Sequence, residues 1–123
     1  MPDFSFLLLH VEDDAASAAF YNGLLGLPII DRKPGFAMLP LRDGVMLGLW
    51  SRETVEPASS GQTGASEIAF AVADKAAVEA THADWKGRGL TIIQAPTGMS
   101  FGTTFVALDP DGHRLRVFAP AAA

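Results

Sequence analysis

The sequence contains no cysteine among its 123 residues. This absence excludes a disulfide framework, a zinc ribbon, an iron–sulfur cluster and a thiol nucleophile. Any metal would have to be held by histidine, aspartate or glutamate. The sequence has only three histidines, His10, His82 and His113, and their scattered positions have none of the spacings of a zinc site.

Basic residues are also scarce, with 9 Lys and Arg against 14 Asp and Glu and a net charge of −5. No basic stripe is present that could neutralise phosphates, so nucleic acid is not an expected partner. The apolar run from Phe4 to Leu9 is too short for a signal sequence or a membrane span, and no basic residue precedes it. We therefore expect a soluble, cytoplasmic protein with no membrane partner.

Hydrophobic residues are plentiful, at 49% of the chain, and charged residues make up 19%. This balance is typical of a compact globular protein and not of a disordered or fibrous chain. The length is that of one domain, which we expect to span residues 1–123.

The sequence contains an internal repeat. Gly26-Leu27-Pro28-Ile29-Ile30 recurs as Gly89-Leu90-Thr91-Ile92-Ile93, and the Asp-Gly turn at residues 43–44 recurs at residues 111–112. The matches occur in the same order in both halves, which indicates a duplicated structural unit.

Each half predicts a strand, a helix and three further strands. The first half gives strands near 4–11, 29–31, 36–39 and 45–50, with a helix from about 13 to 25 that ends at Gly26. The second half gives strands near 67–72, 91–94, 104–108 and 113–118, with a helix from about 74 to 86. We therefore predict an α+β fold of two tandem βαβββ modules, which form a curved mixed sheet with a cleft. Module one covers about 4–51, the linker 52–65 and module two about 66–119.

The strand alternation separates two faces of the predicted sheet. One face is aliphatic, with Leu7, Leu9 and Val11 in the first strand, and we expect it to pack on the helices. The other face mixes large aromatic, methionine and charged residues with glycine and alanine, a composition typical of a cavity wall. Its members include Phe6, His10, Met46, Gly48, Trp50, Glu67, Arg116 and Phe118.

The duplicated module resembles the vicinal oxygen chelate superfamily of glyoxalases, extradiol dioxygenases and bleomycin- and fosfomycin-resistance proteins. The resemblance rests on Phe20-Tyr21 and Leu25-Gly26 in the first helix and on Asp109-Pro110-Asp111-Gly112 before the last strand. It implies a fold and leaves the activity open, because this scaffold carries many functions.

The resemblance also places the metal ligands of the metal-dependent members at four positions, occupied here by Phe6, Gly48, Glu67 and Arg116. Only Glu67 could bind a divalent ion, and the guanidinium of Arg116 would repel one. We therefore expect no metal site, no cofactor and no metal-dependent chemistry.

A closer resemblance is to the phenazine antibiotic resistance proteins, metal-free members that bind a planar tricyclic compound between the subunits of a dimer. It rests on Leu49-Trp50-Ser51, Ser66-Glu67-Ile68, Phe101-Gly102-Thr103-Thr104-Phe105, Asp109-Pro110-Asp111-Gly112-His113 and Arg116-Val117. It implies that Trp50 stacks on the ligand and that Glu67 and Arg116 replace the metal ligands. The departure is His10, at a position where the family commonly has an aromatic residue.

The favoured hypothesis is a homodimer that binds a planar aromatic or drug-like small molecule in an interface cleft, with no catalytic residues. Met99 and Phe101, in a glycine-flanked loop, would form a flexible rim over the ligand. The candidate ligand-binding residues are Trp50, Phe6, His10, Met46, Glu67, Met99, Phe101, Arg116 and Phe118. Several of them have a simpler structural explanation: Trp50 as a core or interface residue, Glu67–Arg116 as a structural ion pair, His10 as a partly buried hydrogen-bonding residue, and Met99 and Phe101 as dimer contacts.

The alternative hypothesis is a divergent glyoxalase or dioxygenase-type enzyme. It would use a weakly held metal at Glu67 and His10, or His10 alone as a base in a metal-free lyase or isomerase.

Overall fold

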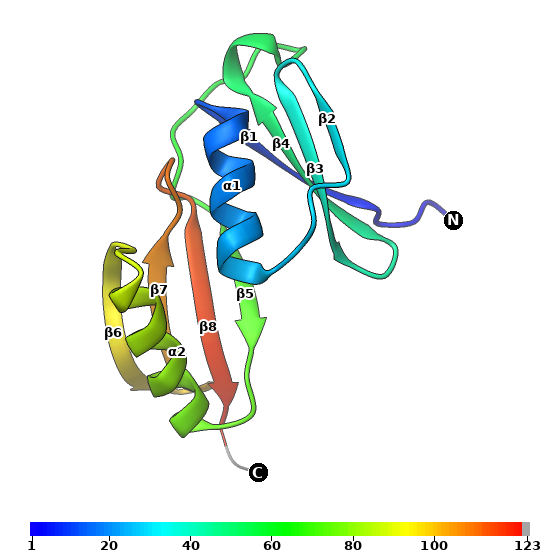
Figure 1. The fold of residues 1–123 in the computed structure, drawn as a ribbon. Helices are drawn as coiled ribbons and strands as arrows, with labels where there is room; N and C mark the ends of the chain where they lie inside the picture. The colour runs from blue at the N-terminus through cyan, green and yellow to red at the C-terminus, as the bar shows by residue number, and fades with distance from the viewer. Residues whose placement is uncertain (122–123) are drawn as a thin grey trace. The chain divides into compact units, whose positions relative to one another are not determined.

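The computed structural model describes residues 1–121, and the expected domain therefore extends two residues beyond them. The chain divides into two compact units, Met1–Gly61 and a second unit that begins at Gln62. Each unit consists of one α-helix and a four-stranded sheet (Figure 1).

The first unit contains β1 (Phe6–Val11), α1 (Asp14–Leu25), β2 (Asp31–Lys33), β3 (Phe36–Arg42) and β4 (Val45–Ser51). A short 3₁₀ helix, η1 (Arg52–Thr54), follows β4. The strand order is β1-β4-β3-β2, in which β1 and β4 are parallel and the other pairs are antiparallel.

The second unit contains β5 (Glu67–Ala71), α2 (Lys75–Gly87), β6 (Ile92–Met99), β7 (Gly102–Leu108) and β8 (Arg114–Pro120). Its order, β5-β8-β7-β6, repeats that of the first unit, and the parallel pair is again the first and last strand. The predicted α+β fold of two tandem βαβββ modules is therefore confirmed, with one four-stranded mixed sheet in each module.

The helices begin and end where local sequence signals predict. Asp13 precedes α1 and its Oδ1 accepts a hydrogen bond of 3.1 Å from the amide of Ala16. Asp74 does the same for α2, at 2.8 Å from the amide of Ala77. Gly26 follows α1 with a φ of 68°, a left-handed conformation that glycine adopts without a steric penalty. The helix boundaries are therefore set by capping residues that lie next to each helix in the sequence.

The aliphatic face of each sheet packs on the helix of its own unit, as predicted. In the first unit Val11, Leu47 and Leu49 are fully buried, together with Ala18 and Tyr21 of α1. In the second unit the buried residues include Val78, Trp85, Phe105, Ala107, Leu115 and Val117. The helices cover one face of each sheet, which leaves the opposite face available for a site.

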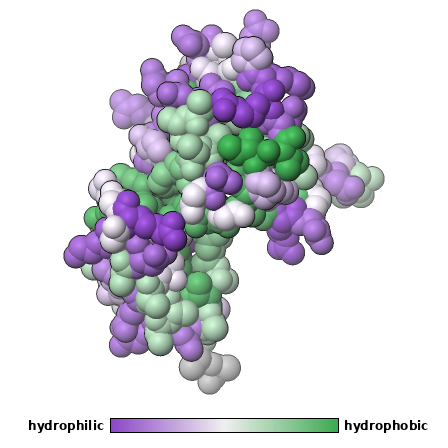
Figure 2. Space-filling model, viewed as in Figure 1, coloured by the Kyte–Doolittle hydropathy of each residue, from purple (hydrophilic) through white to green (hydrophobic). Residues whose placement is uncertain are grey.

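The surface of α1 is mildly hydrophobic over much of the face that Figure 2 presents. This agrees with the exposed alanines Ala15, Ala16 and Ala19 of this helix. Ala-rich helices form readily with few charged side chains, because alanine has the most favourable helix propensity.

The expected strand near 29–31 is displaced in the structure, where β2 covers Asp31–Lys33. The amide of Ile30 donates to the carbonyl of Met38, but regular pairing with β3 begins only at Asp31. β2 is a three-residue edge strand between Pro28 and the Pro34-Gly35 turn, so its position depends on β3 and not on its own hydrophobicity.

The expectation that Met99 and Phe101 lie in a loop is wrong for Met99, which is the last residue of β6. β6 extends through Pro96 to Met99, and Ser100 and Phe101 form a two-residue turn into β7. Pro96 is tolerated because β6 lies at the edge of its sheet, where the pairing with β7 also shifts register. The segment is therefore a hydrogen-bonded hairpin.

No helix in the described part of the chain has the length and apolar character needed to cross a membrane.

Candidate functional site

The open face of the first sheet carries aligned rows of side chains. His10 of β1, Trp50 of β4 and Phe36 of β3 are direct neighbours across the three strands. The next row comprises Leu8, Gly48 and Met38, and the last comprises Phe6, Met46 and Pro40. Apart from the His10 imidazole, these side chains are apolar.

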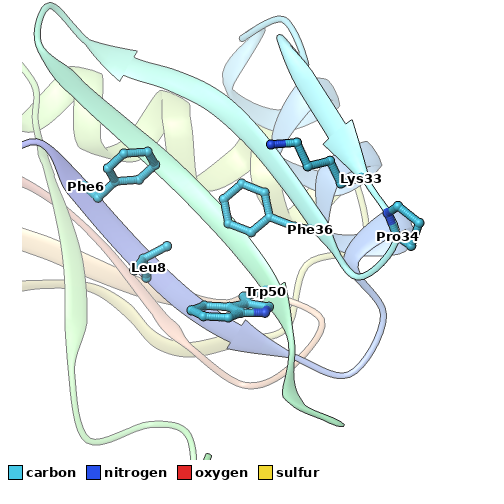
Figure 3. Close-up of a pocket in the computed structure, with 6 residues that line it drawn as sticks. All are labelled: Phe6, Leu8, Lys33, Pro34, Phe36 and Trp50. Carbon is cyan, nitrogen blue, oxygen red and sulfur yellow. The ribbon is translucent and has the colours of Figure 1, made fainter. Parts of the chain in front are cut away.

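A cavity of about 460 Å³ lies on this face. It is lined by residues of β1, β2, β3 and β4 and of the turn after β2, which Figure 3 shows together: Phe6, Leu8, Lys33, Pro34, Phe36 and Trp50. Its volume falls within the roughly 300–1,000 Å³ that is usual for small-molecule sites, and its lining is mainly apolar, as in such sites. Phe6 and Leu8 are 41% and 45% exposed, although both are large hydrophobic residues. We call this cavity the Trp50 cavity.

Trp50 stands between two perpendicular rings. Phe36 lies at 6.3 Å between ring centroids with an interplanar angle of 85°, and His10 at 6.4 Å with an angle of 88°. A planar aromatic ligand stacked on Trp50 would meet the Phe36 ring edge to face. Aromatic rings favour both of these arrangements.

Gly48 provides the space in which the cavity's side chains lie. A Cβ atom at this position would come within 2.5 Å of Leu8 Cδ2 and 3.1 Å of Phe36 Cζ. Because glycine has no Cβ, Leu8 and Phe36 extend over the β4 backbone. Any larger residue would displace them and reduce the cavity.

His10 is joined to Ser59 by a hydrogen bond of 2.7 Å between Nδ1 and Oγ. Ser59 belongs to the segment after η1, and 49 residues separate it from His10 in the sequence. The bond therefore connects that segment to the end of β1, beside Trp50.

The open face of the second sheet carries a charged cluster. The Arg116 guanidinium binds Glu67 with two bonds, from Nε to Oε1 at 2.8 Å and from Nη2 to Oε2 at 3.0 Å. Arg114 donates from Nη1 to Glu67 Oε2 at 3.1 Å. Two arginines thus share one carboxylate, and the ion pair expected from the sequence between Glu67 and Arg116 is present.

Arg116 is held further by neighbours on the same sheet. Its Nη1 donates to Gln94 Oε1 at 3.3 Å and to Thr104 Oγ1 at 3.1 Å. Its guanidinium carbon lies 6.0 Å from the centroid of the Phe101 ring, within the range of a cation–π contact. With 18% of its side chain exposed, Arg116 is more enclosed than Arg114, at 41%.

Two aromatic residues lie on the same face as the charged cluster. Phe101 and Phe118 are in edge-to-face contact at 6.3 Å. Gln94, which accepts from Arg116, directs its Nε2 at Met99 Sδ at 3.7 Å. Of the nine predicted site residues, Glu67, Met99, Phe101, Arg116 and Phe118 are thus brought together in the second unit.

The hydrogen bonds from Arg116 hold the pKa of the Glu67 carboxyl below its usual value. Partial burial opposes this shift, and the charges of Arg116 and Arg114 reinforce it. The same bonds raise the pKa of Arg116. Both groups therefore stay ionised through the neutral range.

Replacing Glu67 with glutamine should remove an acid-sensitive part of the stability. Because folding lowers the pKa of Glu67, its ionised form stabilises the fold above its unfolded pKa of about 4.3, and this contribution is lost as the pH falls through the folded value. We expect Glu67→Gln to lower the free energy of unfolding by roughly 0.5–1 kcal/mol at pH 7, because the pair is partly exposed. Urea denaturation at pH 7 and pH 3 measures the difference.

The matched control is Glu79→Gln, which removes an exposed i,i+4 pair with Lys75 at 4.0 Å. Its effect should be no more than about 0.5 kcal/mol. If the difference in unfolding free energy between the wild type and Glu67→Gln is the same at pH 7 and pH 3, the ionised carboxylate does not stabilise the fold.

The donor set does not fit a metal ion. Phe6 and Gly48 have no side-chain donor, and Glu67 is bound by two cationic groups that a metal would have to displace. Within residues 1–121, no group of three or more His, Asp or Glu side chains is arranged to hold a metal.

The structure brings the other four predicted residues to the open face of the first sheet. Phe6 and Trp50 line the Trp50 cavity, whereas His10 and Met46 lie on the same face outside its lining. Seven further residues of the first and second units lie at these sites without having been predicted from the sequence, as does Leu8 of the cavity lining: Lys33, Pro34, Phe36, Ser59, Gln94, Thr104 and Arg114. Arg114 could have been found, because it stands two residues before Arg116 on the same face of β8.

The structure thus defines a protein of two βαβββ modules. In each module the helix packs on one face of the sheet, and the other face carries the cavity or the charged cluster described above. The family model described as the Glyoxalase/Bleomycin resistance protein/Dioxygenase superfamily matches residues 4–117. The chain therefore belongs to this superfamily, and the predicted superfamily resemblance is confirmed.

Solved structures support the assignment. A protein from Agrobacterium tumefaciens, determined by solution NMR, is 46% identical and has a TM-score of 0.89; the match covers 99% of this chain and 100% of that one. A glyoxalase/bleomycin resistance protein/dioxygenase from Nocardioides is 25% identical with a TM-score of 0.85, over 100% of this chain and 86% of that one.

A lactoylglutathione lyase from Agrobacterium tumefaciens has a TM-score of 0.76 over 95% of this chain and 92% of that one. At 19% identity, this likeness shows the fold alone. Among curated proteins, no match to the sequence was found.

Proposed function

We propose that this protein binds a planar aromatic or drug-like small molecule without a metal, in the manner of the phenazine resistance members of its superfamily. The observation that carries the proposal is the Trp50 cavity, an open apolar space of about 460 Å³ with two perpendicular aromatic rings in its wall. Such a wall binds flat, hydrophobic molecules by stacking and by burial of apolar surface.

A binding role also agrees with the chemistry of the polar groups. The carboxylate of Glu67 is neutralised by Arg114 and Arg116, so it is poorly suited to act as a base or a metal ligand. His10 lies beside Trp50 in the same row of side chains, and its Nδ1 is already hydrogen-bonded to Ser59.

The direct test is a titration of chelator-treated protein with phenazine, a planar tricyclic probe. Trp85→Phe serves as the background, so that Trp50 is the remaining tryptophan. Saturable quenching of its fluorescence without added metal supports the proposal.

A stoichiometric metal in the purified protein, lost on chelation together with a lyase or dioxygenase activity, would favour the enzyme alternative. If the metal-free protein catalyses a lyase or isomerase reaction and the His10→Gln variant does not, the enzyme alternative with His10 as the base is favoured.

We further propose that a second copy of the chain completes the cleft. Phe4, Phe6 and Leu8 are between 41% and 72% exposed, and monomeric soluble proteins rarely leave contiguous apolar surface of this kind in water. A symmetric dimer would bury the same surface on both copies.

Sedimentation equilibrium at micromolar concentration should therefore report a species of about 26 kDa, twice the chain mass of 13.0 kDa. Phe6→Glu should shift it toward the monomer, because the change places a charge in the apolar interface. The control is Ile93→Glu, which changes a residue of the second unit that is 44% exposed. A wild-type protein that sediments as a monomer would remove the interface cleft from the proposal.

A further inference from the structure

The Trp50 cavity has a single charged residue in its lining. Five of the six lining residues are apolar, and the sixth is Lys33, at the end of the edge strand β2. Figure 3 shows its side chain extending from β2 to the side of the sheet on which the Phe36 ring lies. The cavity therefore presents a cation at one end and hydrophobic surface elsewhere.

The register of the sheet places this cation beside the aromatic wall. Lys33 pairs with Phe36, and Phe36 pairs with Trp50, so the three residues form one row across β2, β3 and β4. A flat ring that contacts Phe36 and Trp50 thus has one edge directed at Lys33. A substituent on that edge would reach the ammonium group.

The present partner of Lys33 leaves capacity for a ligand. Its Nζ lies 3.5 Å from Asp31 Oδ2, and the side chains are 71% and 38% exposed. Such a pair is weak, because water screens both charges. An ammonium group has three N–H donors, so it can bind an anion while it keeps contact with Asp31.

The apolar surroundings strengthen this preference. A ligand in the cavity would displace part of the water around the Lys33 amino group, and the attraction between opposite charges rises as the local dielectric falls. A neutral ligand of the same shape gains no such attraction. A carboxylate at this edge of the cavity would therefore gain an attraction that a neutral group lacks.

We propose that Lys33 makes the Trp50 cavity selective for planar aromatic carboxylates over neutral aromatic compounds of the same shape. This inference rests on the proposed function and specifies its ligand class. Lys33 acts as a specificity residue: it pairs with the carboxylate, while Trp50 and Phe36 bind the ring.

The test compares 2-naphthoate with 2-naphthamide, two probes of nearly equal shape that differ in charge. Quenching of Trp50 fluorescence, in the Trp85→Phe background at neutral pH and low salt, gives both dissociation constants. We expect naphthoate to bind more tightly by roughly 2- to 5-fold, the range of an exposed charge pair. Lys33→Met should abolish that ratio and leave naphthamide affinity unchanged, because methionine keeps the apolar stem.

Three further variants isolate the charge of Lys33. Lys33→Arg should keep the preference for naphthoate. Asp31→Asn should increase it, because Asp31 competes for the ammonium group. Lys75→Met makes the same change in net charge on α2, outside the lining of the Trp50 cavity, and should leave the ratio as in the wild type.

The outcomes separate this inference from the function on which it rests. Charge selection is overturned if the wild-type protein binds the two probes with equal affinity, or if Lys33→Met weakens the binding of both probes equally. In either case the binding of aromatic compounds is still supported. If neither probe quenches Trp50, the binding function itself fails for this class of ligand.

Discussion

The Trp50→Ala variant should bind planar aromatic ligands about 1–3 kcal/mol more weakly, a factor of roughly 5–150 in the dissociation constant. The loss has two sources, the removal of a stacking partner and the removal of buried aromatic area. Trp50→Phe should retain part of the affinity, because a smaller ring still stacks. Calorimetric titration with phenazine measures these affinities without a need for the tryptophan signal.

The control is Trp85, which lies in the core of the second unit at 5% exposure and contacts Phe70 and Phe105. Trp85→Phe should leave the affinity unchanged. Trp85→Ala should cost about 3–5 kcal/mol of stability, whereas Trp50→Ala should cost less, because a cavity wall has packing partners on one side only. A Trp50→Ala protein that is severely destabilised yet binds with unchanged affinity would make Trp50 a structural residue.

The Gly102→Ala variant should lose about 2–6 kcal/mol of unfolding free energy. Gly102 has a φ of 141°, and a Cβ there would overlap the carbonyl oxygen of Ala119 in the adjacent strand β8. The strained backbone accounts for roughly 1–3 kcal/mol and the overlap for a similar amount. Chemical denaturation monitored by circular dichroism gives the value.

Gly98 is the matched control, because it stands near the other end of the same hairpin turn. A Cβ at Gly98 would meet no atom within 4 Å, and its φ is not positive. Gly98→Ala should therefore be neutral or stabilise the protein by up to about 1 kcal/mol. Equal effects at the two positions would show that backbone packing at Gly102 does not constrain the hairpin.

Helix boundaries and sheet faces could be predicted because their causes are local in the sequence. Asp13 and Asp74 bond to amides three residues ahead, and Gly26 ends α1 through its own φ. The alternation of side chains likewise requires only one strand at a time. The edge strands β2 and β6 were placed less well, because their limits depend on partners elsewhere in the chain.

The candidate site follows the same rule: residues whose position depends on one strand could be predicted, and residues that depend on strand pairing could not. Trp50 could be assigned to the open face from the alternation within β4. Phe36 and Lys33 could not be placed beside it, because that row depends on the order and register of β2, β3 and β4. Ser59 gives no signal at all, since its bond to His10 joins two segments without a shared pattern.

Strand β4 contributes to the hydrophobic core on one side and to the ligand cavity on the other, and Gly48 affects only the cavity side. Its neighbours Leu47 and Leu49 point into the fully buried core, whereas position 48 opens the Trp50 cavity by lacking a side chain. Substitutions that resize the ligand space can thus occur on one side of β4 while the packing on its other side is unchanged. A scaffold of this kind can evolve toward ligands of different size with little effect on folding, which is one physical route to the functional breadth of the superfamily.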